Sequence, residues 1–310
     1  MSIEVRHVIH VNANCSDVGR SKPYYESVAD LFARFHTYPE PQDGTAFGID
    51  GGLQWDAWIM ANKQGIEGVP AVDLLEWKMP PPLGSPYSEI SHLGMVRLCF
   101  AVTDIDAHYA RLTQEGVRCV STPVPCPLWP GEGTRMFCVT DPDGIWLQFV
   151  QGNAAQFQYV NVNCSNLQRS AEFYAEVLGF AIESRSRPGP VPGTGFGIDG
   201  DVEWDACFLK LPGQPSGTFR VNLVEWKRPR PIPSPYREAN HLGLYRMAMA
   251  VDDIGSAYHE LKRKGVECLS PPITLNMDRS DPPRTACFML FLDPDGTCLE
   301  FIEQRPTPPS

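Results

Sequence analysis

The sequence predicts an α+β protein made of four βαβββ units, and two observations lead to this prediction. The chain of 310 residues is a tandem repeat, with copies at roughly residues 1–152 and 153–310. Each copy contains, twice, a strand-like run followed by a helix-like stretch and further short strand-like runs. Apolar residues make up 43% of the chain, which is enough for a sizeable core.

The repeat becomes visible when the chain is shifted against itself by 149 residues. The shared segments begin at Asn14 and Asn163 (Asn-Cys-Ser), Phe47 and Phe196 (Phe-Gly-Ile-Asp-Gly), Trp55 and Trp204 (Trp-Asp-Ala), Glu76 and Glu225 (Glu-Trp-Lys), and His92 and His241 (His-Leu-Gly). The shift becomes 152 at Asp141 and Asp293, where both copies read Asp-Pro-Asp-Gly. Matches over such a length indicate that the two copies share one fold.

The elements follow one order in both copies. In the first copy, residues 11–16 predict a strand that leads into a helix over 21–35, which Ser16 or Asp17 caps. Residues 97–102 predict a second strand, followed by a helix over 105–115 that Gly116 ends. The second copy has the same pairs of strand and helix at 159–163 with 170–178, and at 246–251 with 254–264. Further strands are expected at 55–60, 72–77, 136–140 and 145–150.

Charge and composition argue against several classes of partner. The net charge is −11, which does not suit a nucleic-acid backbone or an anionic membrane. No apolar run is long enough for a transmembrane helix, and the N-terminus lacks the pattern of a secretory signal. The ten cysteines form no Cys-x-x-Cys pair and lie mostly in apolar runs, which is typical of reduced thiols. We therefore expect a cytoplasmic protein, monomeric or homodimeric, that acts on a small molecule.

Three features in register resemble the vicinal oxygen chelate superfamily. They are a strand followed by Ser16-Asp17 and a helix, a strand that runs through Val-x-Asp-Ile into the second helix, and Asp-Pro-Asp-Gly before the last strand. This superfamily contains glyoxalase I, extradiol dioxygenases, methylmalonyl-CoA epimerase, and fosfomycin and bleomycin resistance proteins. The resemblance covers almost the whole chain, twice. It implies two paired domains with curved mixed sheets around a cavity.

The resemblance also implies up to four inward strand positions that hold a metal ion, usually through histidine, glutamate or glutamine. In the first and second copy, respectively, the first position holds His10 and Tyr159, the third Arg97 and Arg246, and the fourth Gln148 and Glu300. The second position is open: it holds either Asp73 and Asn222 or Glu76 and Glu225. A guanidinium stays protonated, has no lone pair to donate and repels a cation. Arginine at the third position therefore favours a protein without a metal cofactor.

The alternative is a bound metal ion, which one arrangement of the four units would allow. If the first unit pairs with the fourth across the two copies, His10, Asp73 and Glu300 converge as a histidine with two carboxylates. Such a set would suit a divalent Fe, Mn, Zn, Co or Ni ion. Arg246 would still lie beside it.

The same positions supply the candidate catalytic residues, which are His10, Arg97, Gln148, Tyr159, Arg246 and Glu300. The arginines either form structural ion pairs with Glu76 and Glu225 or clamp a carboxylate or oxyanion. His10 is a candidate general acid or base, because histidine ordinarily titrates near neutral pH. Tyr159 is a candidate proton or hydrogen-bond donor, and Glu300 would act as a base if burial raised its pKa.

Tryptophans are the candidates for a substrate-binding wall. Trp77 and Trp226 either line a cavity or pack in the core. Trp129 lies in a loop where the copies differ in length and sequence, so we expect it to act as a lid. His92 and His241 precede Leu-Gly at a strand entrance, where we expect a structural or pocket-rim role.

The two copies differ at the first and fourth positions, which indicates two unequal pockets. We favour a small-molecule enzyme with non-redox acid–base chemistry, an isomerase, lyase, cyclase or hydrolase, whose substrate is aromatic or bears a carboxylate or carbonyl group. One alternative is a metal-dependent glyoxalase-like lyase or extradiol-type dioxygenase. The other is a protein that binds a drug or metabolite and confers resistance to it.

Overall fold

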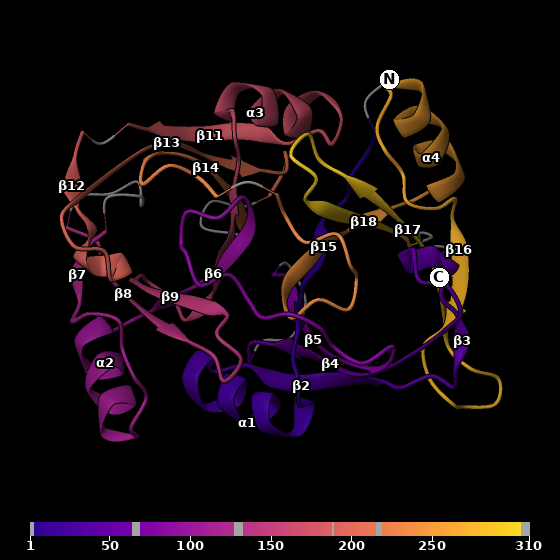
Figure 1. Ribbon diagram of the computed structural model, residues 1–310, viewed down its shortest axis with the longest axis horizontal. Helices are drawn as coiled ribbons and strands as arrows, with labels where there is room; N and C mark the ends of the chain where they lie inside the picture. Colours follow the sequence, from indigo (N-terminus) through magenta and orange to yellow (C-terminus); the bar gives the residue numbers. More distant parts are fainter. Residues whose placement is uncertain are drawn as a thin grey trace.

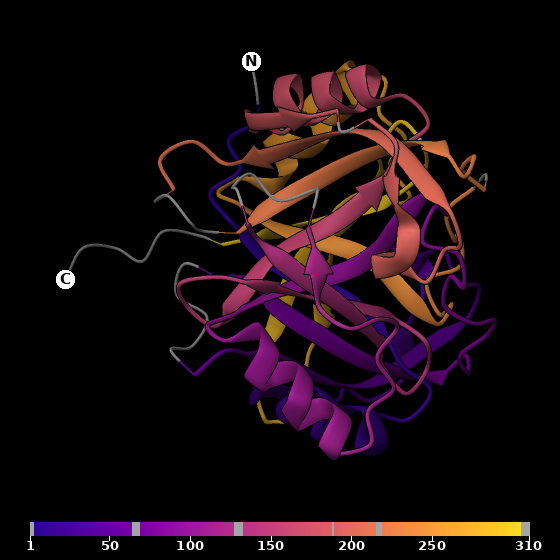
Figure 2. The ribbon, with the colours of Figure 1, turned by 90° about the vertical axis from the view of Figure 1, so that its left-hand side faces the viewer.

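The chain folds into two curled sheets that lie side by side (Figure 1). The computed structural model describes residues 3–63, 69–126, 133–187, 189–214, 219–232 and 234–304. Within these ranges there are two nine-stranded mixed sheets, four α-helices and two short 3-10 turns. The helices cover the outer faces of the sheets, as Figure 2 shows for α3 above and α2 below the strands. The predicted α+β class with curved mixed sheets is confirmed.

The first sheet combines the first and the fourth unit of the chain. Its strands, in spatial order, are β16 (Ile273–Asn276), β17 (Thr285–Leu292), β18 (Cys298–Glu303), β15 (Gly243–Val251), β1 (Val8–Asn14), β5 (Ala71–Met79), β4 (Gly52–Ala61) and β2 (Phe32–Thr37), with β3 (Gln42–Asp43) also on β4. The two units meet where β1 pairs antiparallel with β15, with His10 opposite Ala248.

The second sheet combines the second and the third unit. Its strands, in spatial order, are β11 (Ala181–Ser186), β13 (Asp201–Lys210), β14 (Arg220–Arg228), β10 (Gln156–Asn163), β6 (Gly94–Val102), β9 (Trp146–Gln151), β8 (Arg135–Thr140) and β7 (Val124–Pro125), with β12 (Val191–Pro192) on β13. Here β10 pairs antiparallel with β6, with Tyr159 opposite Cys99. Each sheet therefore takes one unit from each copy of the repeat, so the units pair across the copies.

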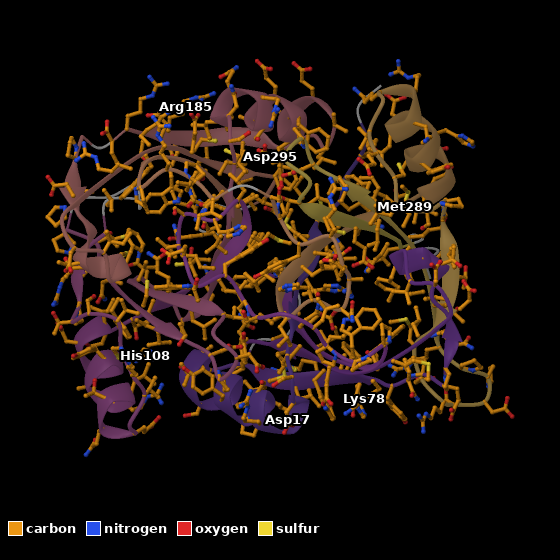
Figure 3. The ribbon with its side chains drawn as sticks, in the orientation of Figure 1. Asp17, Lys78, His108, Arg185, Met289 and Asp295 are labelled. Carbon is orange, nitrogen blue, oxygen red and sulfur yellow. The ribbon has the colours of Figure 1, made fainter. Side chains whose placement is uncertain are left out.

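The helices tie the two sheets together within each copy. They are α1 (Val18–Ala29), α2 (Ile105–Gln114), α3 (Leu167–Glu176) and α4 (Ile254–Arg263). At the start of α1, Ser16 and Arg20 donate hydrogen bonds to Asp143 in the Asp-Pro-Asp-Gly turn between β8 and β9. Ser165 and Arg169 contact Asp295 in the same way beside α3, and Figure 3 shows Asp17 next to α1 and Asp295 next to α3. The turn motif is thus a contact between two units of one copy.

The first helix is shorter than predicted. The pattern predicted a helix over 21–35, but α1 ends at Ala29 and residues from Phe32 to Thr37 form β2. Asp30 follows the helix in the left-handed region at φ 51°, where its backbone N–H bonds Tyr25 O and ends the helix. Within the described ranges, none of the helices is both long and apolar enough to span a bilayer.

On the concave side of each sheet, apolar side chains pack into a separate cluster (Figure 3). In the first sheet this cluster includes Phe47, Trp55 and Phe288. In the second sheet it includes Phe196 and Trp204. A third cluster packs the helices against the convex sides. The polar residues of interest lie within the two concave clusters.

Candidate functional site

Four polar side chains meet on the concave side of the first sheet. They come from four neighbouring strands, β18, β15, β1 and β5, at positions where the pleat turns the side chain inward. The residues, called the first cluster, are His10, Asp73, Arg246 and Glu300, and all four are buried. Their convergence follows from the pairing of the first unit with the fourth, the arrangement under which His10, Asp73 and Glu300 were expected to converge.

The Arg246 guanidinium bridges the two carboxylates of the first cluster. Its Nε donates to Glu300 Oε2 at 2.8 Å, and one terminal nitrogen donates to Asp73 Oδ2 at 2.9 Å. Asn12 also donates its amide to Asp73 Oδ2, at 3.2 Å. The buried cation is thus held by two charge-assisted hydrogen bonds of ordinary length. This geometry leaves the other terminal nitrogen, Nη1, buried and without a hydrogen-bond partner among the described residues.

His10 lies next to both carboxylates. Its Nε2 is 3.5 Å from Glu300 Oε2 and 3.8 Å from Asp73 Oδ2. These separations allow electrostatic attraction but exceed ordinary hydrogen-bond length. The imidazole Nε2 therefore has no hydrogen-bond partner among the described residues, although it is buried. Both His10 Nε2 and Arg246 Nη1 remain available to a ligand.

The charges of the first cluster stabilise one another. Burial by itself would raise the pKa of Glu300, but the neighbouring Arg246 and His10 outweigh it and lower that pKa below its usual value. Burial likewise opposes the charge on Arg246, yet Glu300 and Asp73 raise its pKa further. Glu300 is therefore an ionised carboxylate. The condition under which it was expected to act as a base, a pKa raised by burial, is not met.

A cavity of about 50 Å³ lies against the first cluster. All four cluster residues line it, and most of the remaining wall is apolar, including Phe47, Trp55, Leu75, Phe288 and Ile302. The enclosed space is large enough for a small reacting group or a few water molecules. Apolar walls around a few converging polar groups are typical of a small-molecule site.

The second sheet carries an equivalent group with different chemistry, called the second cluster. It consists of Tyr159, Asn222, Arg97 and Gln148, and these side chains are completely buried. Gln148 Oε1 accepts hydrogen bonds from Arg97 Nε at 2.8 Å and from the Tyr159 hydroxyl at 2.9 Å. The six predicted catalytic residues are therefore divided between two sites, three in each.

The comparisons with known proteins agree with this architecture. A family model of the Glyoxalase/Bleomycin resistance protein/Dioxygenase superfamily matches residues 7–149 and again residues 156–301. The chain belongs to this superfamily. Glyoxalase I from Zea mays has a similar fold, with a TM-score of 0.69 and 16% sequence identity over 96% of this chain and 92% of that one.

Two shorter relatives are similar to about half of the chain. The uncharacterized protein YwkD of Bacillus subtilis is 27% identical over 146 residues, which is 47% of this chain and 94% of YwkD. The uncharacterized protein YaeR of Escherichia coli is 28% identical over 149 residues, 48% of this chain and 96% of YaeR. One copy of the repeat thus corresponds to nearly the whole length of each relative.

The resemblance to this superfamily implies a divalent ion at the first cluster, but the donor set does not fit one. Asp73 Oδ2 and Glu300 Oε2, which face His10, already accept hydrogen bonds from Arg246. An ion between them and His10 would lie against a permanent cation. In the part of the chain that the structure describes, no group of three or more histidine, cysteine, aspartate or glutamate side chains is arranged to hold a metal ion.

Two phenylalanines that were not among the predicted site residues cover the arginines. Arg246 lies 5.4 Å from the ring centre of Phe47, and Arg97 lies 5.3 Å from that of Phe196. Both rings belong to the repeated Phe-Gly-Ile-Asp-Gly segment, at the 3-10 turns η1 (Thr45–Phe47) and η2 (Gly193–Phe196). A cation over an aromatic face gains favourable electrostatic energy. The repeat of this segment was the signal that could have identified both residues.

Of the two roles predicted for Trp77 and Trp226, the structure shows packing in the core. Trp77 is buried behind Phe47 and donates its indole N–H to Asn14 Oδ1 at 3.1 Å. Trp226 does the same toward Asn163 in the second sheet. Both therefore pack in the core and hold β1 and β10, whereas Trp55 lines the cavity instead. Trp129 lies outside the described residues.

Of the two alternatives for the arginines, the ion pairs with Glu76 and Glu225 are not formed among the described residues. Glu76 accepts a hydrogen bond from the backbone N–H of Val18, at the first turn of α1, and pairs with Lys78. Glu225 has the matching role at the start of α3, where it accepts from Leu167 and pairs with Lys227. Since strand side chains alternate between faces, Asp73 and Asn222 point inward and these glutamates do not.

His92 and His241 lie at the ends of a four-ring stack between the sheets. His92 stacks on Tyr87 at 4.0 Å, Tyr87 on Tyr236 at 3.9 Å, and Tyr236 on His241 at 3.9 Å. Each histidine Nδ1 also contacts the carbonyl oxygen of the following leucine. These contacts are those of a structural element at the junction of the two sheets.

Proposed function

We propose that this protein is a small-molecule enzyme that moves a proton next to a carbonyl group at the first cluster, without a metal ion. One observation supports this most directly: Arg246 bridges Asp73 and Glu300, and its Nη1 and the Nε2 of His10, both without a hydrogen-bond partner among the described residues, belong to side chains that line one cavity. A fixed cation there can replace a metal ion in stabilising negative charge on a substrate oxygen.

In this mechanism each residue has a separate task. His10 Nε2 takes a proton from the carbon next to the substrate carbonyl, and the electron pair moves onto the carbonyl oxygen to give an enolate. Arg246 Nη1 donates a hydrogen bond to that oxygen. Glu300, ionised and 3.5 Å from His10 Nε2, stabilises the imidazolium that forms. His10 then returns the proton, to the same carbon or to another, so no electrons leave the substrate.

The cavity suggests the kind of substrate. Its apolar walls and its volume of about 50 Å³ suit the reacting end of a molecule, with an apolar or aromatic remainder toward Met277 and Ala286 on the same wall. A second oxygen on the reacting end would use the remaining donor capacity of Arg246. We therefore propose carbonyl compounds that carry a carboxylate, such as 2-oxo acids, as the substrate class.

Proton exchange with the solvent tests this function directly. Pyruvate and phenylpyruvate are incubated with the protein in heavy water, and deuterium uptake at the carbon next to the carbonyl is followed by NMR. Uptake is expected with the wild type, and the rate should fall by about 10²–10⁴ in His10→Gln, as for loss of a general base. His259→Gln, which changes an exposed histidine of α4, is the matched control and should exchange at the wild-type rate.

The same assay separates the metal-free mechanism from its alternative. Exchange should persist after treatment with a chelator such as dipicolinate. Loss of exchange on chelation, with recovery after one divalent metal is added, would overturn the metal-free mechanism. Uptake that is equal in wild type and His10→Gln would overturn the role of His10, and no uptake from either compound would overturn the substrate class.

A further inference from the structure

The second cluster keeps the arginine of the first cluster but lacks both of its carboxylates. Asn222 stands at the position of Asp73, and Gln148 at that of Glu300. Arg97 is 0% exposed, and its Nε bonds the amide oxygen of Gln148. Its terminal nitrogens, Nη1 and Nη2, are buried and have no hydrogen-bond partner among the described residues.

An isolated buried guanidinium is energetically costly. It stays protonated in a protein, so it cannot avoid the penalty by losing its charge. One neutral amide acceptor and the face of Phe196 at 5.3 Å compensate for only part of the lost hydration. The first cluster shows the usual solution, two carboxylates on one arginine.

The titratable neighbours Tyr159, Cys99 and Cys138 do not supply the missing negative charge for Arg97. Burial raises the pKa of Tyr159 well above its usual value, and the pKa of Cys99 likewise. Burial also raises the pKa of Cys138 to about 12. These groups are neutral near pH 7, so an anion for Arg97 has to come from outside this set.

We propose that the concave side of the second sheet binds a small carboxylate ligand with an apolar body, whose two oxygens accept hydrogen bonds from Arg97 Nη1 and Nη2. The parallel N–H groups of a guanidinium match the two oxygens of a carboxylate. The surrounding cluster is apolar and rich in aromatic and sulfur-containing side chains, among them Met136, Trp204 and Phe208. This site is separate from the first cluster and does not depend on the function proposed there.

A route to the site lies at the mouth of the second sheet. A cavity of about 590 Å³ is lined there by Val124, Cys126, Arg135 and Thr194, among others. Cys126, on the wall of this cavity, accepts a hydrogen bond at its Sγ from Nε2 of Gln148 at 3.7 Å, and Gln148 is the hydrogen-bond partner of Arg97. Thr194 belongs to η2, the turn whose Phe196 covers the guanidinium.

Benzoate, with benzamide as its neutral isostere, tests the proposal by calorimetry and thermal unfolding of the full chain. Benzoate is expected to bind and to raise the unfolding midpoint, whereas benzamide is not. Arg97→Met should weaken benzoate binding by about tenfold or more, because it removes the guanidinium whose Nη1 and Nη2 would bind the carboxylate. Without ligand, the same variant should raise the unfolding midpoint by about 3 °C or more, because it removes an uncompensated buried charge.

Gln148→Glu is the second variant, and it copies the arrangement of the first cluster. The new carboxylate should pair with Arg97, raise the unfolding midpoint and abolish benzoate binding. His10→Gln, which alters the first cluster alone, should leave benzoate binding unchanged. Binding that survives in Gln148→Glu, or that is lost in His10→Gln, would overturn the proposal.

Two further results would also overturn it. One is absence of benzoate binding to the wild type at millimolar concentration. The other concerns Glu132, which lies outside the described residues. If Glu132→Gln and Arg97→Met both lowered the unfolding midpoint, the charge partner of Arg97 would belong to the chain itself.

Discussion

At the scale of single residues, the two clusters differ mainly in charge. His10 is replaced by Tyr159, Asp73 by Asn222 and Glu300 by Gln148, while the arginine stays the same. Each exchange removes an ionisable carboxylate or imidazole and keeps a polar side chain. The duplication has therefore kept one backbone and changed the electrostatics of one concave side. The resemblance to the superfamily implied these inward strand positions, and it left the second one open between Asp73 and Asn222 on one face and Glu76 and Glu225 on the other.

Replacing Arg246 by histidine is expected to create a metal site. Arg246→His removes the permanent cation and places a second imidazole next to His10, Asp73 and Glu300, a set that suits Zn²⁺, Co²⁺ or Ni²⁺. Calorimetry with these ions should show about one ion bound per chain in the variant and none in the wild type. The matched control is Arg97→His, whose neighbours are neutral and which should bind no ion. Equal binding by wild type and Arg246→His would contradict the idea that the guanidinium takes the place of the metal.

The ion pair between Glu300 and Arg246 should make stability depend on acid pH. Because the folded protein lowers the pKa of Glu300 below its usual value of 4.5, the ionised carboxylate stabilises the folded state above that pH. Glu300→Gln is therefore expected to lower the free energy of unfolding at pH 7 by about 3–5 kcal/mol, the usual cost of breaking a buried pair.

That difference should shrink as the pH falls below 4.5 and through the lower pKa of the folded state, since the wild type then loses the same charge. Urea unfolding of both proteins from about pH 3 to about pH 7 measures this difference in the free energy of unfolding. The range covers the pH at which carboxyl groups ordinarily titrate. The exposed Glu238→Gln provides the control, with an expected change within about 0.5 kcal/mol. A difference between wild type and Glu300→Gln that does not vary with pH would contradict the role of the charge.

At the scale of elements, the sequence predicted the order correctly but not every boundary. The helix over 21–35 was predicted too long, because residues 32–37 contain aromatic residues that continue the helical spacing equally well. What ends α1 is the left-handed Asp30, which no sequence pattern marked. The Asp-Pro-Asp-Gly turn shows the converse. Its spacing was recognised, but its contact with the helix of the preceding unit depends on tertiary structure.

That contact gives a prediction for a matched pair of variants. Asp143 accepts hydrogen bonds from the backbone and side chain of Ser16 and from Arg20. Asp143→Asn keeps the shape but loses the charge, and should lower the free energy of unfolding by about 1–3 kcal/mol, as for a charge-assisted hydrogen bond. Asp295→Asn has the same contacts with Ser165 and Arg169 and should cost a similar amount. Urea unfolding measures both, and a loss in only one of the two would contradict a shared role of the turn.

At the scale of the whole molecule, the pairing of the units could not be predicted from the sequence. β6 and β15 are equivalent segments of the repeat, so β1 meets the same pattern of inward and outward side chains on either one. Local patterns therefore could not distinguish pairing within a copy from pairing across copies. The structure places β1 on β15 and β10 on β6, and this choice brings Asp73 to Arg246. The first cluster is consequently a product of both copies.

The cross-pairing predicts how one copy behaves by itself. In residues 1–152 alone, β1 and β6 would each lose the antiparallel partner that the other copy supplies. Exposed edges of this length favour pairing with another chain. We expect the isolated fragment to form a homodimer in which β1 of one chain pairs with β6 of the other, and co-expression with residues 153–310 to restore a one-to-one complex. Analytical ultracentrifugation distinguishes these states, and a stable folded monomer of residues 1–152 would show that a copy can close its own sheet without the partner strand.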